Sequence, residues 1–212
     1  MRVAWRMVQA HNQAYVILRQ ASDAPIGLAY NVTYYTPARR HPLDWLATRY
    51  ENYILNHWFL RHTMCDYIGL NYYFHDKIRV GFFPPRLRST HHGQTAEGFY
   101  QTLRSLGRYG KPIIVTENGV DDETDVLRGQ YITDHVAAMQ RAMAEGVHVD
   151  GYMYWTLVSG PEWESGYSRH FGLLEIDHAT GERTVRDSTL VYKAVIDLCR
   201  RQQFQCSGSA ST

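Results

Sequence analysis

The chain has 212 residues, a formal charge of +1 and 44% hydrophobic residues, which is typical of a folded globular protein. The balance of 22 basic against 21 acidic residues argues against broad attraction to nucleic acid or anionic lipid. We therefore expect no nucleic-acid partner and no membrane association. Because residues 1–6 do not resemble a secretion signal, we also expect a cytoplasmic protein.

The chain reads as one helix followed by four strand-helix pairs. The first helix is expected over residues 2–20. Four short apolar and aromatic runs, typical of strands covered on both faces, are expected at 26–31, 67–73, 112–118 and 151–157. Segments with a period near 3.6 follow them, at 44–60, 96–109, 130–145 and about 190–203. This order predicts an α/β fold with four parallel strands and flanking helices.

Two further segments stand apart from this pattern. An insertion over 158–186 is expected to hold a β-hairpin that turns near Thr180-Gly181. Residues 205–212 are rich in Ser, Gly and Ala, so we expect a disordered tail after a folded region of 1–204. No metal site and no cofactor are expected. His91-His92 has no third metal ligand at a characteristic spacing, so we interpret these residues as loop histidines.

Glu117 ends the most apolar strand, within Val115-Thr116-Glu117-Asn118-Gly119. One interpretation is a solvated carboxylate at an Asn-Gly turn. The other is a nucleophile or base, because the C-terminal ends of parallel strands gather at the ligand-binding end of α/β folds. Position alone does not decide between them.

Two clusters follow the ends of other strands. Trp155, Glu162 and Trp163 combine a carboxylate, which can accept sugar hydroxyl groups, with indoles that can stack on a pyranose ring. Asn71 and Tyr73 end the second strand. Each cluster alone fits packing as well as chemistry, but their common position at strand C-termini favours a site.

Three motifs taken together resemble glycoside hydrolase family 1, the β-glucosidase family. They are Gly69-Leu70-Asn71-Tyr72-Tyr73, the Glu117 motif, and residues 151–157 with 162–173. The resemblance extends from about residue 1 to about 196. It implies the C-terminal half of a (β/α)8 TIM barrel, in which the four strands are the fifth to the eighth and the opening helix follows the fourth strand.

The resemblance also implies roles for these residues. Glu117 would be the nucleophile of a retaining mechanism, and Tyr73 would orient it by a hydrogen bond. The implied substrate-binding residues are Asn71, Trp155, Glu162, Trp163 and Phe171. Because a carboxylate such as Glu162 would repel a phosphate, unphosphorylated β-glucosides or related glycosides are the expected substrates.

The sequence departs from the family pattern in two places. Ser159-Gly160-Pro161 stands where the family has Asp-Asn-Phe, and no Asn-Glu-Pro motif, which carries the general acid/base, occurs in these residues. We therefore expect activity only with a partner, either an N-terminal half-barrel or a second copy of the chain. The alternative hypothesis is a non-catalytic, sugar-binding or inert half-barrel.

Overall fold

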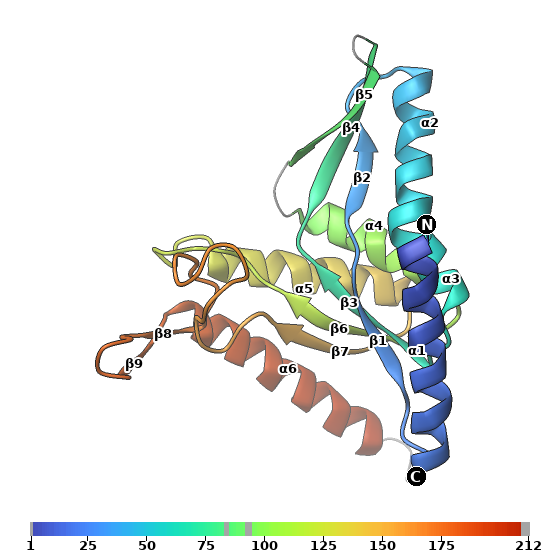
Figure 1. The fold of residues 1–212 in the computed structure, drawn as a ribbon. Helices are drawn as coiled ribbons and strands as arrows, with labels where there is room; N and C mark the ends of the chain where they lie inside the picture. Colours follow the sequence, from blue (N-terminus) through green and yellow to red (C-terminus); the bar gives the residue numbers. More distant parts are fainter. Residues whose placement is uncertain (1, 83–84, 92–94, 209–212) are drawn as a thin grey trace. The chain divides into compact units, whose positions relative to one another are not determined.

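The computed structural model describes residues 2–82, 85–91 and 95–208 (Figure 1). The chain divides into two compact units, which are described separately below. The first comprises Met1–Asn118 and Ala137–Met153, and the second comprises Gly119–Val136 and Tyr154–Thr212.

A four-stranded sheet forms the centre of the first unit. Its order is β1-β3-β6-β7, and β1 pairs with β3 and β3 with β6 in parallel. The strands are β1 (Gly27–Asn31), β3 (Tyr67–Tyr72), β6 (Ile113–Asn118) and β7 (Val149–Tyr154). The predicted α/β arrangement is confirmed, although the last strand begins and ends earlier than expected, so that Trp155 follows it.

The helices of this unit differ in how much they bury. α1 (Arg2–Ala21) buries only Val8, whereas α4 (Ala96–Gly107) buries the apolar face that its sequence periodicity predicts. The first turn of α4 is capped by the Thr95 hydroxyl, which accepts from the Gly98 N–H at 3.1 Å. The side chains of α4, the strands and α5 (Arg128–Ala144) share one core, in which the fully buried members are Leu70, Tyr72, Phe99, Leu103, Leu106, Ile113, Val115 and Ala142.

The helix expected at 44–60 is interrupted. It consists of α2 (Pro42–Glu51), a π-helical segment η1 (Asn52–His57) and α3 (Trp58–His62). The Trp58 N–H donates to the Tyr53 carbonyl, five residues back, as a π-helix requires. Such a segment preserves a broadly helical apolar pattern, so the 3.6 period of the sequence did not reveal it.

A second, three-stranded sheet in the first unit was not predicted. It has the order β2-β4-β5, formed by β2 (Tyr34–Pro37), β4 (His75–Phe82) and β5 (Pro85–His91). In Figure 1, α2 runs alongside it. The expectation that His91 and His92 are loop histidines is wrong for His91, which ends β5, whereas His92 lies outside the described residues.

The second unit contains the predicted hairpin and the last helix. β8 (Leu174–Ile176) and β9 (Arg183–Val185) pair antiparallel, as expected. The unit also holds the start of α5 (Arg128–Ala144) and the helix α6 (Ser188–Gly208). Because α6 continues through Gly208, the expected tail begins later than residue 205; residues 209–212 lie outside the described residues, and their disorder stays a prediction.

Candidate active site

The first group of site residues lies where β3 and β6 end. Asn71 and Glu117 face each other in the register of the two strands, which shifts between Leu70 and Asn71. The Tyr73 hydroxyl donates a hydrogen bond of 2.8 Å to Glu117 Oε2. The Thr116 hydroxyl donates to Asn71 Oδ1 at 2.6 Å. The pairing of β3 with β6 thus brings Asn71 and Tyr73 close to Glu117, which lies up to 46 residues later in the sequence.

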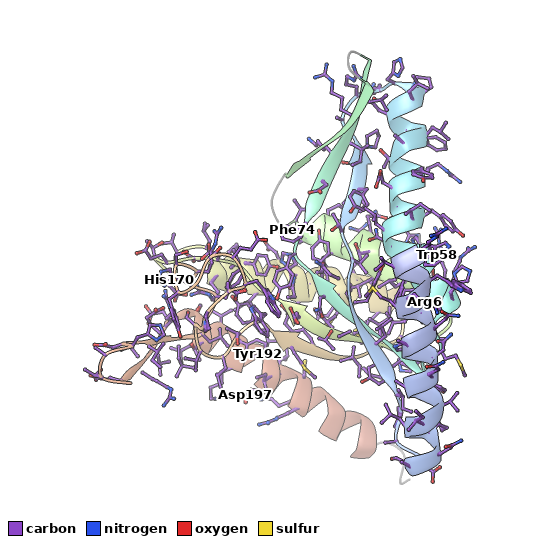
Figure 2. The ribbon with its side chains drawn as sticks, in the orientation of Figure 1. Arg6, Trp58, Phe74, His170, Tyr192 and Asp197 are labelled. Atoms are coloured by element: carbon purple, nitrogen blue, oxygen red, sulfur yellow. The ribbon has the colours of Figure 1, made fainter. Side chains whose placement is uncertain are left out.

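The backbone beneath Glu117 is fixed by its neighbour. Asn118 is fully buried, and its amide donates to the Tyr72 carbonyl at 2.9 Å while accepting from the Tyr152 hydroxyl at 2.8 Å. One side chain therefore ties the ends of three strands together. Phe74, the residue after Tyr73, packs its ring 6.0 Å from the tyrosine ring beyond the end of β3 (Figure 2).

The second group lies in the second unit and joins Trp155 to Glu162. The indole Nε1 of Trp155 donates to Glu162 Oε1 at 3.1 Å. Glu162 sits on a tight turn, in which its backbone and that of Gly166 exchange hydrogen bonds of 2.8 and 2.9 Å. The pair presents an indole face and a carboxylate, the two kinds of group that contact a sugar ring and its hydroxyl groups.

Trp163 and Phe171 are the other two residues that the sequence predicts to bind substrate here. Trp163 is fully exposed, with no covering atoms from the chain. Phe171 is half-buried, and its carbonyl accepts from the Thr156 N–H at 3.4 Å. The structure therefore pairs Trp155 with Glu162 and leaves the indole of Trp163 in solvent.

Gly119 follows Asn118 because no side chain fits there. A Cβ at this position would lie 1.9 Å from the Trp155 carbonyl oxygen. The Asn-Gly pair that ends the strand thus reflects a close approach of two backbone segments within the second unit.

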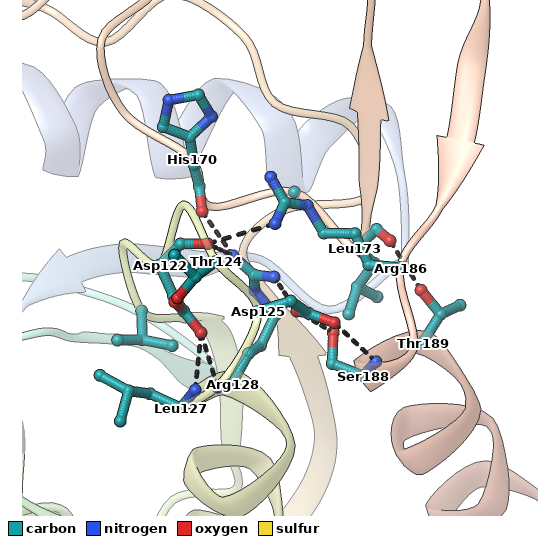
Figure 3. A network of polar contacts seen from close by, with 12 residues as sticks. Asp122, Thr124, Asp125, Leu127, Arg128, His170, Leu173, Arg186, Ser188 and Thr189 are labelled. Atoms are coloured by element: carbon teal, nitrogen blue, oxygen red, sulfur yellow. Dashed lines mark hydrogen bonds and ion pairs between the residues drawn. The ribbon is translucent and has the colours of Figure 1, made fainter.

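A buried arginine, missed by the sequence analysis, organises the loop that follows Gly119 (Figure 3). Arg128 is fully buried and forms an ion pair with Asp125. It also donates to the carbonyls of Asp122 and His170 at 2.6 and 2.5 Å and to the Tyr154 hydroxyl at 3.1 Å. The signal was the acidic run Asp121-Asp122-Glu123 ahead of a helix that begins with arginine.

Asp121 could replace a missing acid/base only if it held a proton. Burial by itself raises the pKa of Asp121, but hydrogen bonds from the His170 N–H at 2.8 Å and from Arg169 at 2.7 Å outweigh it and lower that pKa. The carboxylate is therefore held ionised, which does not suit a general acid.

Within residues 2–82, 85–91 and 95–208, no cluster of three or more His, Cys, Asp or Glu side chains is arranged to hold a metal ion. Among the helices of the same residues, none combines the length and the hydropathy of a membrane span.

The family model for glycosyl hydrolase family 1 matches residues 83–200, more than half of the chain. The chain belongs to glycosyl hydrolase family 1. This family 1 chain is 32% identical to a β-galactosidase of Sulfolobus acidocaldarius, with 90% of the chain and 46% of that protein covered. It is 28% identical to β-glucosidase A of Acetivibrio thermocellus, with 92% and 56% covered.

The fold agrees with that of solved family 1 structures. The β-glycosidase from Pyrococcus horikoshii superimposes with a TM-score of 0.83 at 28% identity, covering 91% of this chain and 52% of that one. The chain spans about half the length of these relatives. Its four strands and flanking helices therefore form half of a family 1 TIM barrel, as the sequence predicted.

Proposed function

We propose that this family 1 chain supplies the nucleophile of a retaining β-glycosidase that acts on unphosphorylated β-glucosides or related β-glycosides. The observation that carries the proposal is the 2.8 Å hydrogen bond from Tyr73 to Glu117 at the ends of β3 and β6. A hydrogen bond from the hydroxyl fixes the direction of the carboxylate. Because Tyr73 occupies Oε2, Oε1 is the oxygen that would attack.

The proposed reaction has two steps. Glu117 attacks the anomeric carbon and forms a glycosyl ester as the leaving oxygen departs, and water then cleaves that ester. Both steps need a second carboxyl group, roughly 5 to 5.5 Å from the first, to give and then take a proton. The sequence has no Asn-Glu-Pro, and Asp121 is held ionised, so the acid/base would come from a partner.

The second unit would contribute to substrate binding. Trp155 offers an indole face, Glu162 a carboxylate for sugar hydroxyl groups, and Phe171 and Trp163 further apolar surface; Asn71 would bind beside the nucleophile in the first unit. A phosphate on the sugar would meet the negative charge of Glu162, which favours unphosphorylated substrates. The names of the relatives, a β-galactosidase and a β-glucosidase, support the β-glycoside class.

The proposed partner is an N-terminal half-barrel, or failing that a second copy. β1 forms one edge of the four-stranded sheet, and within the described part of the chain its outer side is unpaired. In addition, α1 carries an apolar stripe at a spacing of three and four residues, all of it exposed. The stripe consists of Val3, Met7, Ala10, Ala14, Ile17 and Ala21.

The test is covalent trapping with dinitrophenyl 2-deoxy-2-fluoro-β-glucoside. Its leaving group departs without protonation, so the nucleophile alone should react and the acid/base is not required. We expect one fluoroglycosyl group on the isolated chain, mapped by peptide mass spectrometry to Glu117. Glu117→Gln should abolish labelling, whereas the exposed Glu164→Gln should not.

A folded chain that stays unlabelled would contradict the proposal. If that chain still bound glucose in a titration, the non-catalytic sugar-binding hypothesis would hold instead.

A further inference from the structure

A cationic cavity lies in the first unit, away from the strand ends that carry Glu117. Its volume is about 630 Å³, within the range of small-molecule sites. It is lined by residues of α2, η1, α3 and the end of α4, helices that finish shortly before β3 and β6 begin. The nucleophile lies instead at the other ends of these two strands.

Three arginines line the cavity without a carboxylate among the lining residues. They are Arg49, Arg61 and Arg108, all exposed at the cavity surface. None of the ion pairs found among the described residues includes any of the three. Arginines are common at helix C-termini, where they complement the helix dipole, and this accounts for each of the three singly, at the ends of α2, α3 and α4. It does not account for the gathering of three guanidinium groups without ion pairs around one cavity.

Aromatic rings hold two of these side chains in place. The Arg49 guanidinium lies 4.8 Å from the ring centre of Trp45, and that of Arg61 lies 5.6 Å from the ring centre of Tyr53. Stacked guanidinium groups keep their N–H donors at the ring edge, where an anion can accept from them. The Arg61 guanidinium also hydrogen-bonds to the Tyr109 hydroxyl. Part of the ordering of these long side chains is therefore complete before a ligand arrives.

The wall of the cavity is polar and preorganised. The His57 ring is hydrogen-bonded through Nδ1 to the Tyr109 hydroxyl at 2.9 Å and through Nε2 to the Ser105 hydroxyl at 3.1 Å. The rings of His57 and Tyr109 also stack, 5.8 Å apart. Burial lowers the pKa of His57, and the charges of Arg61 and Arg108 lower it further, so the positive field of the arginines reaches the wall.

The π-helical segment η1 provides this arrangement. It contributes Asn52, Tyr53 and His57 to the lining, and it ends at His57 itself. π-helical segments are rare and occur frequently at functional sites.

We propose that this cavity binds a small molecule bearing a phosphate monoester, with Arg49, Arg61 and Arg108 around the phosphate and the Tyr53 and Tyr109 rings against the organic part. Arginine forks match phosphate oxygens in pairs, and the cavity is larger than a lone phosphate requires. The site is independent of the proposed glycosidase function, because it shares no residue with the glycosidase groups.

Phenyl phosphate titrated into the intact chain by calorimetry tests the proposal. We expect saturable binding that is tighter than that of inorganic phosphate, and none of benzyl alcohol. Arg49→Gln, Arg61→Gln and Arg108→Gln should each weaken binding roughly tenfold or more, the usual effect of losing a charge-assisted hydrogen bond. The matched control is Arg6→Gln, an exposed arginine on α1 outside the cavity (Figure 2), which should bind as the unchanged chain does.

Three outcomes would overturn the proposal. They are the absence of saturable binding of phenyl phosphate, an equal loss in the Arg6 variant, and equal affinity for phenyl phosphate and inorganic phosphate. Thermal unfolding of each variant, which should match that of the unchanged chain because all four arginines are exposed, separates lost binding from lost folding.

Discussion

Tyr73 and Glu117 share one hydrogen bond, and the proposed chemistry depends on it. Removing the hydroxyl in Tyr73→Phe leaves the ring in place and frees the carboxylate to rotate. A hydrogen bond to a charged group is worth about 1.5–3 kcal/mol, so we expect labelling by the fluoroglucoside to slow by roughly ten- to a hundredfold.

The control for this prediction is the preceding residue. Tyr72 also ends β3, but its hydroxyl donates to the Thr95 carbonyl at 3.1 Å and not to Glu117. Tyr72→Phe should therefore leave the labelling rate unchanged. Equal rates for Tyr73→Phe and the unchanged chain would show that Tyr73 does not orient the nucleophile.

His135 gives the stability of the second unit a dependence on pH. It is buried on α5, its Nδ1–H donates to the Tyr131 carbonyl at 2.9 Å, and burial lowers its pKa from 6.5 to about 4. Between these values the unfolded chain binds a proton that the folded chain does not, so stability falls as the pH falls. The loss should reach up to about 3 kcal/mol between pH 6.5 and 4.

Urea unfolding over that pH range measures this effect. His135→Phe removes the titrating group, so the variant should lose less stability on acidification than the unchanged chain. The exposed His178→Phe, in the same unit, should behave as the unchanged chain does. Parallel pH profiles for the His135 variant and the unchanged chain would contradict the prediction.

At the scale of elements, Arg128 holds the β6–α5 loop to the rest of the second unit. Arg128→Met removes the cation beside Asp125 and leaves several buried hydrogen-bond acceptors without their donor. We therefore expect a loss of about 3–5 kcal/mol in the free energy of unfolding. Denaturant unfolding measures it. The exposed Arg169→Met, which breaks an ion pair with Asp121, is the comparison and should cost about 1 kcal/mol or less.

The sequence predicted the elements whose residues carry one simple period. The four central strands are nearly continuous apolar runs, although only β3 is largely buried while β1 and β7 keep exposed residues, and α4 shows its buried face at every turn. The second sheet was not predicted because charged residues interrupt the apolar runs of its strands. Ile78 and Val80 of β4 do alternate with Lys77 and Arg79, so a weak period-2 signal was present.

Part of the candidate site was likewise predictable, and part was not. Glu117 was found because a carboxylate at the end of a buried strand is unusual, and strand pairing then brought Asn71 beside it. The role of Arg128 depends on carbonyl groups, such as that of His170, which come near only when the chain folds. Backbone acceptors carry no sequence signature, so such a network could not be predicted.

At the scale of the whole molecule, the exposed stripe on α1 predicts association. Mixing the chain with the N-terminal half of a family 1 β-glucosidase should hydrolyse an aryl β-glucoside faster than either half alone. Ile17, a member of the stripe that is 64% exposed, should be covered in that complex, so Ile17→Asp should weaken association and lower the recovered activity.

The control substitution lies on the same helix outside the stripe. Gln9→Asp adds the same charge to an exposed position on another side of α1 and should leave the recovered activity unchanged. No gain in activity on mixing, with both halves folded, would rule out an N-terminal half-barrel as partner; a solution mass twice that of the chain would then indicate a second copy.

The π-helical segment has a consequence for how this chain is aligned with relatives. A π turn accommodates one residue more than an α turn, so η1 absorbs a one-residue insertion locally, and the residues after it keep the direction they would have in an uninterrupted α-helix. Deleting one residue there would restore a regular helix without turning α3 relative to α2. Leu60, buried in the core, would stay on the inward side. A sequence comparison should therefore place a one-residue gap within η1 and keep the residues of α2 and α3 aligned on either side of it.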